Sequence, residues 1–114
     1  MYDIDDRYTD FFNKINPVLY KYKIGHRTHL GFGAQSVEKA LLESGLTTED
    51  FAGIIKEVNV DLPDDMPLAP NGKTHFDELY SLRYEEFIAL NTMMIQRLQS
   101  KINNLERQLA EIKR

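Results

Sequence analysis

The last third of this 114-residue chain carries a heptad repeat, and no other feature limits the possible folds so strongly. The stretch from about Arg83 to Arg114 contains no proline or glycine, which predicts one uninterrupted helix. From Ile95 onward, apolar residues recur at spacings of 3, 4, 3, 4 and 3, as they do along a coiled coil. The predicted seam consists of Ile88, Asn91, Ile95, Leu98, Ile102, Leu105, Leu109 and Ile112.

An apolar seam of this kind has to be covered by another helix, because it would otherwise be exposed to water. An apolar stripe can also line the core of a monomeric bundle, but the sequence predicts no second long helix to cover it. We therefore predict self-association through a coiled coil that starts at about residue 88. In the heptad, position a is occupied by Ile95, Ile102 and Leu109, and position d by Leu98, Leu105 and Ile112. Isoleucine at a with leucine at d favours a coiled coil of two helices, whereas Leu109 at a and Ile112 at d favour one of three or four helices. The heptads alone leave dimer and trimer open, while Lys101 at g and Glu106 at e suit parallel chains.

The preceding residues, 1–82, predict a small mixed head. Apolar residues at helical spacing predict a short helix from Asp5 to Ile15. Alternating residues predict a strand over 18–23 and a second strand over 28–34, joined as a hairpin. With the helix of residues 83–114, the predicted class is α+β: short strands and helices followed by one long C-terminal helix.

The rest of the head predicts one more helix, a turn and a strand. Ser36 is expected to cap a helix that Gly45 ends. Thr47 then offers a cap for a single further turn. We predict a strand in the C-terminal half of 51–60 and a proline-rich loop over 61–75.

Composition excludes several classes of function. A net charge of −4 argues against a nucleic-acid partner, because binding phosphates requires clustered lysine and arginine. The chain has no cysteine, so disulfides and thiolate zinc sites are excluded. Its three histidines are not spaced as metal ligands, and no apolar run is long enough to span a membrane. We therefore expect no cofactor, metal or membrane association.

Residues 26–37 read HRTHLGFGAQSV, and they form the most distinctive local motif of the chain. The segment resembles the signature of the endosialidase-type intramolecular chaperones. These are self-cleaving serine peptidase domains at the C-termini of phage tail spikes, tail fibres and neck appendages. The positions that match the family motif are His29, Gly31, Phe32, Ala34 and Gln35. The chain departs from the motif at Gly33, where isoleucine is usual, and at Ser36, where glutamate is usual.

The resemblance extends to two further segments. Residues 10–22 are similar to the family's entry of a helix followed by a strand, and residues 80–96 to its tyrosine-bearing approach to an apolar helix. The resemblance implies a parallel homotrimer. It also implies a function in which the domain trimerises, sets three spike chains in register and leaves by self-cleavage.

The resemblance also defines what this chain lacks for catalysis. Family members cut themselves before a serine in a Ser-Asp-x-Arg-Leu-Lys-like motif, in which the lysine serves as the base. The chain begins MYDIDDR, has no such pair, and its first serine is Ser36. We expect the motif to lie upstream or to be lost, and the polypeptide as given to be catalytically silent. The resemblance implies a supporting role in self-cleavage for His29, although a lone strand histidine is also often structural.

Two classes of function follow. The first is an intramolecular chaperone whose partners are its own copies and the upstream spike or appendage segment of its precursor. It would act in the host-cell cytoplasm during virion assembly and would be released from the mature particle. The alternative is a non-enzymatic coiled-coil adaptor that binds another protein through the head.

Overall fold

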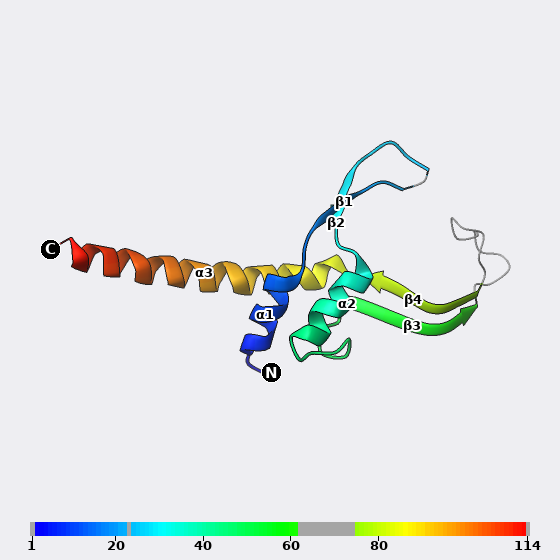
Figure 1. Cartoon of the computed structure of the whole chain (residues 1–114), viewed down its shortest axis with the longest axis horizontal. Coiled ribbons are helices and arrows are strands. Elements are labelled where there is room, and N and C mark those ends of the chain that lie inside the picture. The colour runs from blue at the N-terminus through cyan, green and yellow to red at the C-terminus, as the bar shows by residue number, and fades with distance from the viewer. Residues whose placement is uncertain (1, 23, 62–74, 114) are drawn as a thin grey trace.

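The computed structural model describes residues 2–22, 24–61 and 75–113. Its elements follow in the order α1, β1, β2, α2, β3, β4 and α3 (Figure 1). A mixed head of two short helices and two separate two-stranded sheets carries one long helix that extends well beyond it. The predicted α+β class, with a long C-terminal helix, is confirmed.

Helix α1 spans Asp6–Lys14, close to the prediction. The Asp5 carboxylate caps it by accepting a hydrogen bond of 2.9 Å from the backbone N–H of Arg7. The same carboxylate pairs with the Arg7 guanidinium at 2.9 Å. The helix ends before Asn16-Pro17, because a residue that precedes proline avoids the α region.

The β1–β2 hairpin is shorter than predicted. Strand β1 is Val18–Tyr20 and strand β2 is His29–Gly31, and they pair antiparallel with Leu19 opposite Leu30. The second strand stops early because Gly33 already serves as the N-cap of the next helix. The hairpin projects from the head near the start of the long helix (Figure 1).

Helix α2 spans Ala34–Glu43 and starts earlier than predicted. Its N-cap is Gly33, which makes no side-chain cap hydrogen bond, so the expectation that Ser36 caps this helix is wrong. Glycine is accepted at this position because it leaves the first backbone N–H groups open to solvent. Ser36 lies inside the first turn and is exposed.

Gly45 ends α2 as predicted, in the left-handed conformation with φ of +80°. The amide of Leu46 donates a 2.9 Å hydrogen bond to the carbonyl of Leu41, which is the wider bond of a Schellman motif. A single turn follows, in which the backbone N–H of Thr47 donates to the Asp50 carboxylate at 2.8 Å. The predicted turn is therefore present.

Strand β3, Ile54–Asp61, and strand β4, His75–Leu82, form the longer antiparallel hairpin. The strand predicted late in 51–60 is confirmed, whereas β4 is an element that the sequence analysis did not identify. Of the predicted loop over 61–75, both end residues belong to strands and pair with each other, and residues 62–74 lie outside the described part.

Helix α3, Tyr84–Ile112, confirms the predicted long helix. Its 29 residues extend about 43 Å at about 1.5 Å per residue, and the chain as a whole measures 72 × 35 × 23 Å. Two glutamates in its first turn, Glu85 and Glu86, stabilise the helix because their negative charges interact favourably with the positive N-terminal end of the helix dipole. Within residues 2–22, 24–61 and 75–113, no helix is both long and apolar enough to cross a membrane.

The core lies where α1, α2 and the base of β3 meet the first turns of α3. Its fully buried side chains are Phe11, Val37, Leu41 and Leu46. Phe51 joins this core to α3, with its ring centroid 5.2 Å from that of Phe11 and 5.0 Å from that of Phe87. Burial of this cluster fixes the direction in which α3 leaves the head.

Candidate assembly helix and His29 hairpin

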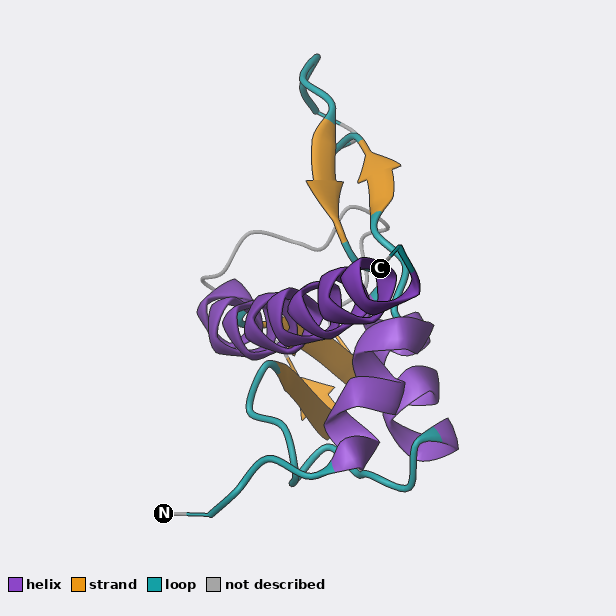
Figure 2. Cartoon of the chain, turned by 90° about the vertical axis from the view of Figure 1, so that its left-hand side faces the viewer, coloured by secondary structure: helices purple, strands orange, loops and turns teal. Residues whose placement is uncertain are grey.

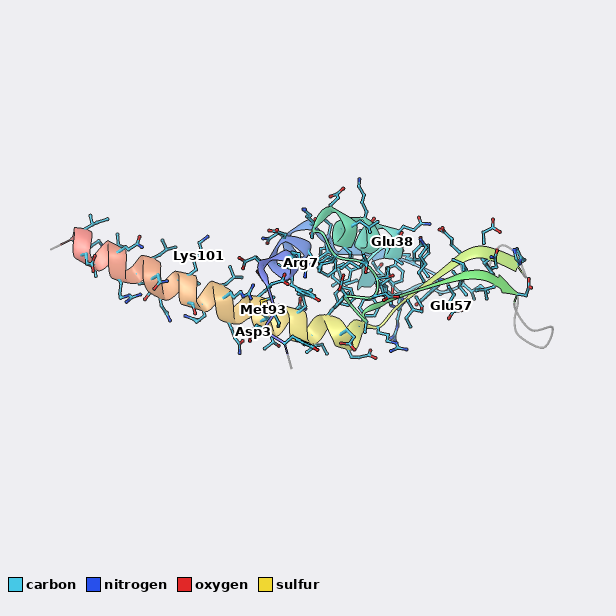
Figure 3. The ribbon with its side chains drawn as sticks, turned by 90° about the horizontal axis from the view of Figure 1, so that it is seen from below. Asp3, Arg7, Glu38, Glu57, Met93 and Lys101 are labelled. Atoms are coloured by element: carbon cyan, nitrogen blue, oxygen red, sulfur yellow. The ribbon has the colours of Figure 1, made fainter. Side chains whose placement is uncertain are left out.

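Helix α3 has one face that belongs to the head. The buried side chains on this face are Phe87, Leu90, Met93 and Met94. They pack into the core cluster, where the two flexible methionine side chains fill irregular space between the helix and the head. In the side-chain view, Met93 lies where α3 passes the head, whereas Lys101 lies on the part beyond it (Figure 3).

A second face of α3 carries the predicted seam and is exposed in the single chain. The apolar seam side chains are between 48% and 78% exposed, and Asn91 is exposed as well. They are Ile88, Ile95, Leu98, Ile102, Leu105, Leu109 and Ile112. Burying the exposed part of each contributes roughly 1 kcal/mol. The head thus holds the helix by one stripe and leaves the other uncovered.

His29 lies between two tyrosines on the short hairpin. Its ring stacks on Tyr20, the cross-strand partner, with centroids 5.3 Å apart. The Tyr22 ring meets it edge-on at 5.0 Å. Tyr20 is half-buried and Tyr22 is exposed, so this pair belongs to the hairpin surface and not to the core. The described contacts of the His29 ring are therefore aromatic.

Gly31 and Phe32, the next motif residues, attach the hairpin to the start of α3. The Phe32 ring stacks on Phe87, with centroids 4.8 Å apart. Its backbone N–H donates a 3.3 Å hydrogen bond to the Tyr84 hydroxyl. A Cβ atom on Gly31 would lie 2.6 Å from that hydroxyl and 2.7 Å from the Tyr20 ring. Any larger residue here would force the tyrosine rings to shift, because both approach the backbone closely.

Ala34 and Gln35 complete the motif as the first two residues of α2. Gln35 is exposed, and no side-chain cap hydrogen bond is made at this helix start. The structure therefore gathers Gly31 and Phe32 against α3, keeps His29 on the hairpin, and leaves Gln35 on the surface.

Ser36 lies beside two lysines in a shallow surface pocket of about 210 Å³. The Lys14 amine donates to the backbone carbonyl of Glu43 at 2.9 Å, and the Lys39 amine pairs with the Glu43 carboxylate at 3.8 Å. Both amines are thus engaged with Glu43. A serine nucleophile needs a neutral base within hydrogen-bond reach, and this arrangement does not present one to Ser36.

A charged network that sequence reasoning missed ties α2 to the longer hairpin. The Lys56 amine pairs with Glu38 at 3.1 Å and with Glu78 at 3.6 Å, and the Tyr80 hydroxyl donates to Glu38 at 3.1 Å. The hydrogen bond to Glu38 is the largest cause that raises the pKa of Lys56 above its ordinary value. These residues come from three elements, so only an identification of β4 would have brought them together.

The sequence of the first part of this chain matches a known protein family. The family model described as "Chaperone of endosialidase" matches residues 2–46, which include the motif of residues 26–37. The predicted resemblance to endosialidase-type chaperones is therefore confirmed. No curated protein sequence matches the chain.

Two solved structures share the fold. One, described as a novel intramolecular chaperon, aligns at a TM-score of 0.67 with 20% identity, over 89% of this chain and 92% of that chain. The other is the carboxy-terminal domain of the bacteriophage T5 L-shaped tail fibre with its intramolecular chaperone domain. It aligns at a TM-score of 0.56 with 19% identity, over 96% of this chain and 29% of that chain. The mixed head with its long terminal helix is thus an architecture that these proteins share.

Proposed function

We propose that this chain is an intramolecular chaperone domain that joins three copies of a phage tail spike, fibre or appendage protein in parallel. The exposed seam of α3 carries this proposal. Seven apolar side chains recur in heptads on a helix whose other face is already committed to its own head. The matches to the chaperone family and to the two chaperone folds support the same function.

The geometry suits a parallel arrangement. The described chain starts at the head, and α3 ends far from it (Figure 1). Parallel helices gather three heads at one end, where upstream segments of three precursor chains would be joined. Lys101 and Glu106 then stand at positions that pair between neighbouring parallel helices.

The chaperone mechanism is alignment at high local concentration. Three chains that share one coiled coil meet at an effective concentration set by their tethers and not by diffusion. An intertwined β-structure has many contacts between distant residues and is slow to start. Holding the three chains in register reduces the entropy that the first such contacts must overcome. This assembly would take place in the host-cell cytoplasm.

Release by self-cleavage is the second part of the proposal. It requires the serine and lysine that the family carries upstream, because Ser36 lies among amines engaged by Glu43. His29 would support the reaction from the short hairpin. The domain would then leave the mature particle.

Sedimentation equilibrium tests the assembly. The chain is expected to sediment as a trimer at micromolar concentration. Ile102→Asp should dissociate it, because each copy would place an unpaired charge in the seam, at a cost of several kcal/mol. Ser100→Asp is the matched control: Ser100 lies two residues away, exposed and outside the seam, and its variant should stay trimeric. A monomeric wild-type chain would overturn the proposal.

A second experiment separates the chaperone from a coiled-coil adaptor. In the precursor that carries this chain, Ile102→Asp should abolish the native spike trimer, whereas Ser100→Asp should preserve it. If the spike reaches its native trimer with Ile102→Asp in place, the domain is not needed for assembly. That outcome would favour an adaptor that uses its head to bind another protein.

A further inference from the structure

The β1–β2 hairpin presents an apolar surface that its own head does not cover. Leu19 and Leu30 face each other across the ladder and are 69% and 77% exposed. Ile24, in the connection between the strands, is 95% exposed. Isolated two-stranded hairpins are marginal in water, and these strands have three residues each. A surface of this kind is normally an interaction site.

The charge of this hairpin indicates what kind of surface would cover it. Residues 18–31 contain Lys21, Lys23 and Arg27 and no acidic residue, in a chain whose net charge is −4. Lys21 and Arg27 are both exposed. The hairpin therefore combines leucine side chains with positive charge, and its complement must be acidic with apolar side chains between the acids.

The β3–β4 hairpin has such a face. Its inner face meets α2 through the network of Lys56 and Tyr80 with Glu38. The opposite face carries the half-buried side chains of Ile55 and Leu79 and the exposed carboxylates of Glu57 and Asp77. Glu57 lies directly opposite Leu79 in the ladder. In Figure 3, Glu57 and Glu38 lie on opposite sides of this hairpin.

Within one chain, the two surfaces do not meet. Seen along α3, the short hairpin extends to one side of the helix, and β3–β4 lies on the other side (Figure 2). The described strands of the two hairpins make no close contact with each other. A neighbouring copy that shares the α3 seam would bring its own β3–β4 hairpin to the same end of the assembly, and a trimer would offer three such pairs.

We propose that the basic β1–β2 hairpin of each copy docks on the acidic outer face of β3–β4 in the neighbouring copy. Leu19 and Leu30 cover Ile55 and Leu79, and Lys21 and Arg27 meet Glu57 and Asp77. The contact rests on the proposed parallel trimer and goes beyond it. It locks the three heads together at the end where the upstream chains enter, whereas the coiled coil joins only the helices.

Disulfide trapping tests this contact directly, because these 114 residues contain no cysteine. One chain carries Leu30→Cys, and a second chain of different mass carries Leu79→Cys. Co-refolded and mildly oxidised, they should form a covalent heterodimer, since docking brings the two Cα atoms within about 7 Å. The matched control pairs Leu30→Cys with Leu42→Cys, another exposed leucine, on α2. That pair should give only background cross-linking.

Charge exchange provides the second arm. Lys21→Glu with Arg27→Glu should reduce the cross-link yield several-fold, and Glu57→Lys with Asp77→Lys on the partner should restore it. Lys39→Glu with Arg107→Glu, at exposed positions on α2 and on the face of α3 away from the seam, should leave the yield unchanged. Sedimentation of each mixture separates the two proposals. A trimer without a heterodimer band would overturn the docking and leave the trimer intact, whereas a monomer would overturn the trimer itself. A yield of cross-linked heterodimer that does not change when the charges are reversed would also contradict the proposed contact.

Discussion

The Tyr84 hydroxyl lies 2.6 Å from the position that a Cβ atom on Gly31 would occupy. Tyr84 is the first residue of α3, and Gly31 is the last residue of β2. The same hydroxyl accepts a hydrogen bond from the backbone N–H of Phe32 at 3.3 Å. The absence of a side chain at Gly31 thus lets Tyr84 approach the short hairpin and fix it to the start of α3.

Replacing Gly31 with alanine should destabilise the fold by about 1–3 kcal/mol, the usual cost of overpacking a close contact. Urea denaturation measures this free energy of unfolding. Gly33→Ala is the matched control: its Cβ would approach nothing nearer than the Ser36 hydroxyl at 3.5 Å, so it should lose only the preference for glycine at an N-cap, about 0.5–1 kcal/mol. Equal losses for both variants would contradict the steric role of Gly31.

Asn59 is the one non-glycine residue with positive φ among those described, at +52° in the middle of β3. Asparagine tolerates this region, whereas a β-branched residue pays roughly 1–2 kcal/mol for it. Asn59→Val should therefore lower the free energy of unfolding by about that amount, and Asn59→Gly should be close to neutral. Thermal denaturation of the two variants checks the difference, and a neutral valine variant would refute the backbone argument.

His75 makes the end of the β3–β4 ladder at which it pairs with Asp61 sensitive to pH. Its Nδ1 lies 2.6 Å from the Asp61 carboxylate, and this hydrogen bond, followed by Asp77, raises the pKa of His75 above its ordinary value of 6.5. The folded state therefore holds the proton more tightly. The resulting stabilisation is complete below the ordinary pKa and is lost as the pH rises through the raised one. NMR titration of the ring measures the folded pKa.

In that titration, Asp61→Asn should bring the pKa of His75 back towards 6.5. Melting temperatures should fall as the pH rises above 6.5 and through the raised pKa in the wild type, and should fall less in His75→Asn. The same pH dependence in both proteins would show that other groups cause it.

His29 offers a test that separates catalysis from structure. In a precursor that carries the serine and lysine motif, His29→Ala should slow self-cleavage while the trimer persists, because the seam lies on α3. A purely structural His29, stacked on Tyr20, predicts normal cleavage with a lower melting temperature. Measuring the cleaved fraction and the melting temperature of one variant distinguishes these outcomes. The chain without that motif should stay intact by mass spectrometry.

Local signals in the sequence were enough to predict much of the fold. The heptads from Ile95 onward and the absence of proline and glycine predicted α3, since helix formation depends on nearby residues. Gly45 predicted the end of α2 for the same reason, because its left-handed conformation is a property of one residue. The motif around Gly31 and Phe32 was also readable as a resemblance before any contact was known.

The elements missed or misplaced depend on distant partners. Strand β4 forms because its residues pair with β3, so Tyr80 and Glu78 gain their roles from Lys56 and Glu38 and not from their neighbours in sequence. The cap at Gly33 depends on where β2 stops. Local sequence was enough to predict that the three helices exist and that α3 carries an apolar seam. The tertiary structure decided which stripe of α3 the head covers, because burial is settled only when separate segments pack together.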